Sequence, residues 1–173
     1  LVQCKSRIDS IYEADITSGR IKTEQRDVQL AQLELSDHES VFEHSDLVIE
    51  AIFENLAVKQ DLIRKIESIA SVNTIIASNT SYIDLDEIAE VSLRPENIVG
   101  IHFFNPAHIM RLVEVIHGNN TSQEVIATAF ALVQKLGKLP IICKNSFGFI
   151  GNRIYAAYRY QCELMLEEGA LPH

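Results

Sequence analysis

The sequence predicts an α/β protein built on a doubly wound, mostly parallel β-sheet. Short, continuous apolar runs, which are typical of strands buried on both faces, alternate along the chain with longer segments whose apolar residues recur at helical spacing. Strands that alternate with helices indicate parallel βαβ units. The strands are expected at about 46–52, 74–78, 98–104, 111–117 and 139–143.

Helices are expected before, between and after these strands. The first two, at 1–18 and 23–32, form a helical hairpin that is broken at Gly19. A short strand at 33–36 and a helical turn that starts at Asp37 or Ser40 follow the hairpin. The remaining helices are predicted at 55–69, 84–91 and 123–136, and from 146 or 148 to 168.

The chain is expected to divide near residue 145. Residues 1–145 would form the sheet domain, and residues 146–173 would form a linker helix that begins a C-terminal helical domain. This last helix carries an apolar stripe that we expect to pack against another domain. The stripe consists of Ile150, Ile154, Ala157, Tyr158, Met165 and Leu166.

Charge and hydropathy argue against two classes of partner. The chain has 173 residues, of which 47% are hydrophobic, so it can bury a substantial core. Its formal net charge of −9 disfavours binding to nucleic acid and to an anionic membrane surface. No apolar run reaches the roughly 18 residues that a transmembrane helix needs.

The cysteines indicate a reducing compartment. Cys4, Cys143 and Cys162 show no Cys-x-x-Cys spacing and no pattern of a disulfide framework, and no metal site is expected. Cys143 lies in an apolar run, which favours a buried thiol. The peroxisome, the mitochondrion and the bacterial cytoplasm all stay open as locations.

Polar side chains follow two of the predicted strands at the point where each strand ends. The first strand is followed by Ser78, Asn79, Thr80 and Ser81, and the second ends in His102-Phe-Phe-Asn-Pro. In open parallel sheets, ligands bind in the crevice beyond the carboxyl ends of the strands. These residues therefore mark a candidate active site.

His102 and Glu114 are the candidate catalytic pair. Imidazole can take up a proton near neutral pH, and a carboxylate on its second nitrogen would fix the tautomer and stabilise the cation. Only a few residues separate the two strands that carry them, so these strands should run antiparallel. A register that places residue 102 opposite 114 is permitted, and the sequence leaves that register open.

Each of these residues also has a purely structural interpretation. His102 could be a hydrogen-bonded structural residue, and Glu114 could be the outward residue of a half-buried strand. Ser81 could cap the helix that follows it.

Taken together, the motifs resemble the 3-hydroxyacyl-CoA dehydrogenase family. They are S-N-T-S, G-I-H-F-F-N-P, L-V-E-V and N-S-F-G-F-I-G-N-R, and they occur in the family's order from about Arg7 to Pro172. The segments SDLVIEAIFENLAVK, HFFNPAH and EEGALP are most similar to the dehydrogenase modules of multifunctional fatty-acid oxidation enzymes.

The resemblance implies a Rossmann-type fold and NAD-dependent oxidation of a 3-hydroxyacyl-CoA to a 3-ketoacyl-CoA, as in fatty-acid β-oxidation. It implies that His102 is the general base and that Glu114 orients it. Ser81 would hydrogen-bond the reacting oxygen, and Asn152 would hold the acyl-CoA substrate.

The resemblance also implies which residues bind the cofactor NAD. These are Glu54, Lys59, Asn105 and again Ser81. Lys59 has an ordinary alternative, because a lysine on a helix face is usually solvated.

One family feature is absent from the sequence. A dinucleotide-binding fold opens with a strand, a Gly-x-Gly-x-x-Gly loop and a helix, and none of the seven glycines has this spacing. We therefore expect an N-terminally truncated domain that is inactive by itself. The strand at 46–52 would be an exposed edge, which favours pairing with another chain and so a homodimer.

Two rival functions stay open. One is a different 3-hydroxy-acid dehydrogenase with the same kind of sheet, against which the His-Phe-Phe-Asn-Pro run and the Glu twelve residues after His102 argue. The other is a non-catalytic structural or interaction module of the same fold.

Overall fold

The computed structural model describes residues 1–171 and contains two compact units, the first of which is Leu1–Val41. In this unit, α1 (Val2–Thr17) and α2 (Thr23–Leu30) form the predicted helical hairpin. The strand predicted at 33–36 is wrong, since these residues are irregular. No strand of their own unit is available to pair with their backbone, and a short unpaired segment has no reason to stay in a strand.

The second unit, which starts at Phe42, holds a five-stranded sheet in the order β1-β2-β3-β4-β5. Neighbouring strands are parallel except for the antiparallel pair β3–β4. The expected five strands and the expected antiparallel pair are therefore confirmed. The strands are β1 (Leu47–Glu50), β2 (Ile75–Ser78), β3 (Ile98–Phe103), β4 (Leu112–His117) and β5 (Leu139–Lys144).

Strand β1 is shorter than predicted. It ends at Glu50, and the backbone N–H of Ile52 donates to the Glu50 carboxylate at 3.2 Å instead of to a neighbouring strand. Within its unit β1 pairs with β2 alone, so it forms an edge of the sheet, as expected.

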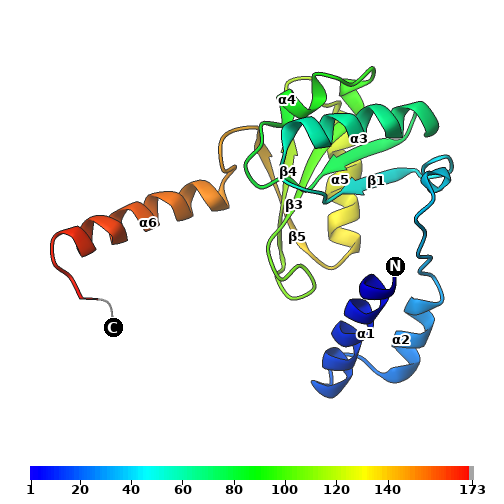
Figure 1. Ribbon diagram of the computed structural model, residues 1–173, viewed down its shortest axis with the longest axis horizontal. Helices are drawn as coiled ribbons and strands as arrows, with labels where there is room; N and C mark the ends of the chain where they lie inside the picture. Colours follow the sequence, from blue (N-terminus) through cyan, green and yellow to red (C-terminus); the bar gives the residue numbers. More distant parts are fainter. Residues whose placement is uncertain (172–173) are drawn as a thin grey trace. The chain divides into compact units, whose positions relative to one another are not determined.

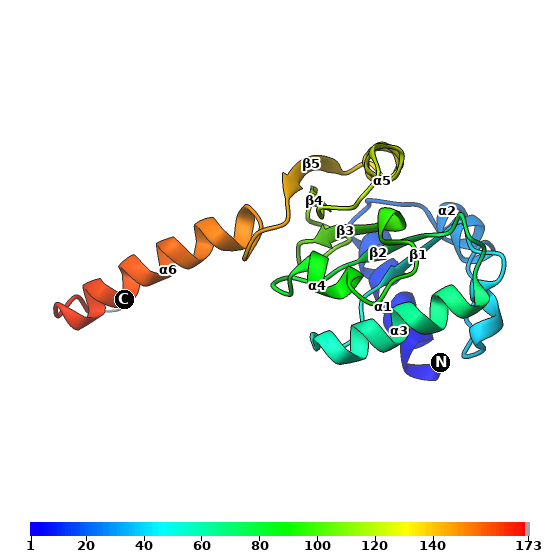
Figure 2. The same ribbon diagram turned by 90° about the horizontal axis from the view of Figure 1, so that it is seen from above.

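Helices cover both faces of the sheet (Figures 1 and 2). The helices α3 (Leu56–Ile69) and α4 (Leu85–Ala89) lie on one face, and α5 (Gln123–Lys135) lies on the other. Two short 3-10 helices, η1 (Glu39–Phe42) and η2 (Pro95–Asn97), precede β1 and β3. This arrangement confirms the doubly wound α/β fold.

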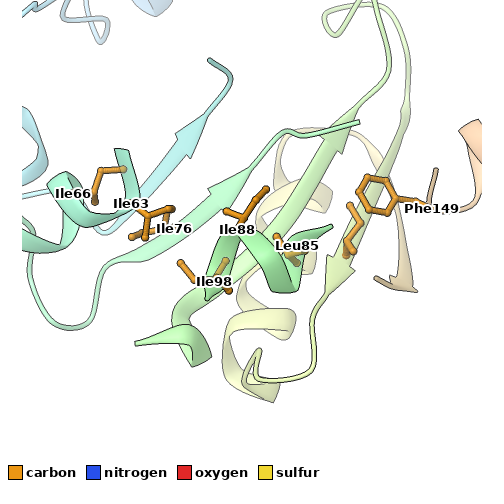
Figure 3. Packing of buried hydrophobic residues seen from close by; sticks show 9 residues of the cluster. Ile63, Ile66, Ile76, Leu85, Ile88, Ile98 and Phe149 are labelled. Atoms are coloured by element: carbon orange, nitrogen blue, oxygen red, sulfur yellow. The ribbon is translucent and has the colours of Figure 1, made fainter. Parts of the chain in front are cut away.

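Each face of the sheet has its own hydrophobic core. Alternate residues of a strand point to opposite faces, so Ile76 belongs to the core under α3 and α4 while Ala77 belongs to the core under α5. Each fully buried isoleucine contributes about 1.5–3 kcal/mol to folding. The first core contains Ile63, Ile66, Ile76, Leu85, Ile88, Ala89, Ile98, Ile116 and Phe149 (Figure 3).

The last helix, α6 (Gly151–Glu167), starts later than predicted. Gly148 and Phe149 have positive φ values of 68° and 47°, and this left-handed backbone cannot continue into a right-handed helix. Residues 147–150 form a turn instead. Ile154, Tyr158 and Met165 of the apolar stripe are 66%, 64% and 56% exposed, so the packing expected for this stripe is not seen in the described residues.

Candidate active site

The antiparallel pair β3–β4 places His102 directly opposite Glu114. His102 Nδ1 lies 2.7 Å from Glu114 Oε2, so the predicted hydrogen bond is confirmed. His102 is 5% exposed and Glu114 is 0% exposed. The interpretation of Glu114 as an outward-facing strand residue is therefore wrong.

Glu114 is held by three donors. Besides His102, the backbone N–H groups of Ile150 and Gly151 donate to its Oε1 at 2.9 and 2.8 Å. Burial by itself would raise the pKa of Glu114, but the hydrogen bonds from His102, Gly151 and Ile150 together with the charge of His102 lower it below 4.5. The carboxylate therefore stays ionised and accepts the Nδ1–H of His102.

Aromatic rings enclose the imidazole. The ring centroids of Phe104 and Phe149 lie 4.7 and 5.8 Å from that of His102. A Cβ added to Gly151 would lie 2.6 Å from Cζ of Phe104, so a larger residue at this position would displace the Phe104 ring. These rings pack against the imidazole, whose Nδ1 is bound to Glu114, so Nε2 is the ring nitrogen that faces Ser81.

Ser81 and Asn152 complete the group of predicted catalytic and substrate-binding residues. Ser81 Oγ is 3.4 Å from His102 Nε2, and the side-chain amide of Asn152 donates to the carbonyl of Ser81 at 3.3 Å. Ser81 does not cap α4, because Asp84 is the capping residue. The structure thus brings together four residues that lie up to 71 positions apart in the sequence.

Glu54 organises the turn that carries Ser81. Its Oε1 accepts hydrogen bonds from Thr80 Oγ1 at 2.6 Å, Ser81 N at 2.8 Å and Tyr82 N at 3.1 Å. Burial alone would raise the pKa of Glu54, whereas these three hydrogen bonds and the charge of Lys59 lower it. The Glu54 side chain is still 40% exposed, so it can also reach a ligand.

Lys59 is not solvated, which corrects the ordinary expectation for a lysine on a helix face. Its side chain is 1% exposed, and Nζ lies 2.9 and 2.8 Å from the two carboxylate oxygens of Glu50 and 3.5 Å from Glu54 Oε2. Glu50 was not identified as a site residue from the sequence. The position of Glu50 inside the apolar run DLVIEAIF is a sequence signal for a buried carboxylate. A buried carboxylate needs a partner, which indicates a role for the residue.

Asn105 lies apart from this buried network. It is exposed, in the loop after β3, and its bond to Pro106 is cis. Asn79, rather than Asn105, binds the end of β3. Its side-chain oxygen accepts a hydrogen bond from the backbone N–H of Phe103 at 2.9 Å. Asn79 was part of the S-N-T-S motif but had been given no role.

Other kinds of site find little support in the described part of the chain. Residues 1–171 contain no group of His, Cys, Asp and Glu side chains arranged to hold a metal ion. None of their helices is long and apolar enough to cross a bilayer. Cys143 is half-buried, and burial together with the charge of Glu114 raises its pKa to about 11, so its thiol is a poor nucleophile at neutral pH.

The lowered pKa of Glu114 predicts a pH-dependent contribution to stability. Glu114→Gln should destabilise the chain by about 1.5–3 kcal/mol at pH 7, since it removes a charged hydrogen-bond acceptor. The difference in unfolding free energy between parent and variant should be fully present above pH 4.5, the ordinary carboxyl pKa. It should shrink as the pH falls through the lower pKa that Glu114 has in the folded state. Urea unfolding between pH 7 and 3 measures it.

The matched control is Glu90→Gln, because Glu90 is an exposed carboxylate at the end of α4. This variant should follow the parent at every pH. A difference between parent and Glu114→Gln that stays constant down to pH 3 would contradict the assignment of an ionised, hydrogen-bonded Glu114.

Three relatives are similar to this chain, one in sequence and two in both sequence and structure. A peroxisomal bifunctional enzyme from Danio rerio is 45% identical over 127 residues, which is 73% of this chain and 18% of that protein. The crystal structure of (S)-3-hydroxybutyryl-CoA dehydrogenase from Ralstonia eutropha matches 99% of this chain and 61% of its own, with a TM-score of 0.96 and 36% identity. The 3-hydroxybutyryl-CoA dehydrogenase of Escherichia coli matches 99% of this chain and 36% of its own, with a TM-score of 0.94 and 33% identity.

The chain therefore spans less than two thirds of the length of each of these relatives. A family model described as the NAD-binding domain of 3-hydroxyacyl-CoA dehydrogenase matches residues 1–146, which is most of the chain. The chain belongs to the 3-hydroxyacyl-CoA dehydrogenase family.

Proposed function

We propose that this chain forms the catalytic part of an NAD-dependent dehydrogenase that oxidises the 3-hydroxyl of a 3-hydroxyacyl-CoA to a ketone, in fatty-acid β-oxidation. The observation that carries the proposal is the buried His102–Glu114 pair at the carboxyl end of β3, with Ser81 Oγ beside the free imidazole nitrogen. Two relatives are named as dehydrogenases of 3-hydroxybutyryl-CoA, which belongs to this substrate class.

His102 would act as the general base. Its Nδ1–H donates to Glu114, so Nε2 carries the lone pair that takes the proton of the substrate hydroxyl. As the C–O bond becomes a carbonyl, the negative charge of Glu114 stabilises the imidazolium that forms. NAD, when bound, supplies the acceptor for the hydride that leaves C3.

Ser81 and Asn152 would bind the reacting end of the substrate. The Ser81 hydroxyl lies 3.4 Å from His102 Nε2, so an oxygen placed against Nε2 can also accept a hydrogen bond from Ser81. The amide of Asn152 makes one long hydrogen bond of 3.3 Å, which a substrate oxygen can replace. Beside them, Tyr82 and Phe147 pack with ring centroids 5.5 Å apart and offer an apolar surface for the acyl chain.

The same strand ends provide groups that fit a dinucleotide. Glu54 is 40% exposed and Asn105 is exposed, so both can contact a cofactor that lies over the carboxyl ends of β1 to β3. Ser81 lies between the substrate and cofactor positions. Lys59 is buried against Glu50 and supports the cofactor side indirectly.

A non-catalytic module is the second candidate, because the sequence has no Gly-x-Gly-x-x-Gly loop. A binding module gains nothing from a buried histidine whose tautomer is fixed by an ionised carboxylate. The His102–Glu114 geometry therefore favours the enzyme.

His102→Gln tests the proposed base in a protein that contains this chain and binds NAD. We expect kcat to fall by about 10²–10⁴-fold, the usual contribution of general-base catalysis, while the Kd for NAD stays within a few-fold of the parent. Glu114→Gln should lower kcat by a smaller factor than His102→Gln, because the imidazole can still act without its orienting partner. Steady-state kinetics measures kcat, and isothermal titration calorimetry with NAD measures the Kd.

His108→Gln is the matched control, since His108 is exposed in the β3–β4 loop and should be replaceable without loss of kcat. If His102→Gln retained kcat within a few-fold of the parent, the assignment of His102 as the base would be excluded.

Cofactor binding by the 173-residue chain alone gives a second test. Without a glycine-rich loop to bind the pyrophosphate, titration with NAD should show no saturable binding in the micromolar range. Fusing a glycine-rich strand–loop–helix segment before residue 1 should restore saturation. Saturable binding by the unfused chain would show that the loop is dispensable.

A further inference from the structure

Glu50 is a buried carboxylate that the proposed reaction does not use. It is 3% exposed at the end of β1, and Lys59, its ion-pair partner on α3, is 1% exposed. Burying two charges is costly, and replacing such a pair by apolar residues often leaves stability unchanged or higher. Stability alone therefore does not explain why Glu50 and Lys59 are both buried.

A first chain of contacts leads from Glu50 to the proposed site through Lys59. The Lys59 ammonium lies 2.8–2.9 Å from Glu50 and 3.5 Å from Glu54 Oε2. The other oxygen of Glu54 accepts the backbone N–H groups of Ser81 and Tyr82. Glu50 therefore holds the Lys59 ammonium in place, and this ammonium in turn holds Glu54 where it binds the amides of Ser81 and Tyr82.

A second chain of contacts runs through Ser78 of β2. The Ser78 hydroxyl donates to Glu50 Oε1, and its oxygen accepts the N–H of Thr80 at 3.2 Å. The backbone carbonyl of Glu50 also accepts the N–H of Asn79 at 2.9 Å. Both routes end in the same turn.

This turn, residues 79–83, depends on these contacts for all of its backbone donors. Asn79 donates to the Glu50 carbonyl, Thr80 to Ser78, and Ser81 and Tyr82 to Glu54. The N–H of residue 83 donates to Thr80 Oγ1, which itself donates to Glu54. Within residues 1–171, the five amides therefore all bind to the Glu50 and Glu54 network.

We propose that Glu50 is a positioning residue that sets the turn 79–83 and, through it, the distance between Ser81 and His102 Nε2. Lys59 acts on the same turn through Glu54, whose Oε2 lies 3.5 Å from its Nζ. The importance of this positioning for catalysis rests on the proposed function. The positioning itself does not, since it concerns hydrogen bonds within the chain.

The test compares Glu50→Gln, Lys59→Met and the double variant by ¹H–¹⁵N NMR of the 173-residue chain. Each single variant leaves one buried charge without its partner, so its melting temperature should fall. The double variant leaves neither buried charge of the pair behind, and Glu54, which loses Lys59, is 40% exposed to solvent, so most of this loss should be recovered. In the double variant, the amide chemical shifts of Ser81 and Tyr82 should nevertheless still differ from those of the parent. The pH titration of these two amides reports the ionisation of Glu54, and its midpoint should move to higher pH because the positive charge of Lys59 is gone.

Glu67→Gln is the matched control. Glu67 is another buried carboxylate of α3, 3% exposed, but it binds Ser92, Leu93 and Arg94 rather than the site. This variant should lose stability and leave the Ser81 and Tyr82 amides unchanged. If the double variant recovered both its melting temperature and the parent's amide positions, the pair would be merely structural and the proposal would be overturned.

Turnover separates the two proposals. In a protein that oxidises the substrate, the double variant should lose about 10²-fold in kcat, the scale of a misplacement of about 1 Å. If the parent shows no dehydrogenase activity, the proposed function fails. The amide shifts would still decide whether Glu50 positions the turn.

Discussion

The site depends on one constraint, which is that Glu114 must remain ionised although no part of it reaches solvent. Three donors meet this requirement, namely the imidazole of His102 and the backbone N–H groups of Ile150 and Gly151. Because these donors come from β3 and from the start of α6, the carboxylate joins three elements at a single point. The orientation of the proposed general base, His102, is therefore a property of the fold rather than of one side chain.

The topology of the sheet makes this junction available. The single antiparallel pair in the sheet sets His102 and Glu114 side by side, and the parallel strands β1 and β2 bring Glu50 and Ser78 to the same edge. The left-handed backbone at Gly148 and Phe149 then turns the chain so that the first amides of α6 point at Glu114. Two buried carboxylates, Glu50 and Glu114, thus flank the proposed reaction site from opposite sides.

Apolar runs and connection lengths predicted most of the fold, because burial on both faces leaves a clear pattern in a strand. The short connection between 104 and 111 also predicted the antiparallel pair and permitted a register with His102 opposite Glu114, although the sequence left that register open. The proposed roles of Ser81, Asn152 and Glu54 came from resemblance rather than from spacing. The burial of Lys59 was not predictable from its helix, since its partner Glu50 lies on a different element.

The ¹⁵N NMR spectrum of the His102 imidazole tests the central claim most directly. If an ionised Glu114 fixes the ring, the neutral imidazole should carry its proton on Nδ1, with the Nδ1–H signal shifted downfield by the carboxylate. Nε2 should then show the chemical shift of an unprotonated nitrogen that is free to take a proton. A neutral His102 that carries its proton on Nε2, or that exchanges freely between the two tautomers, would contradict the account.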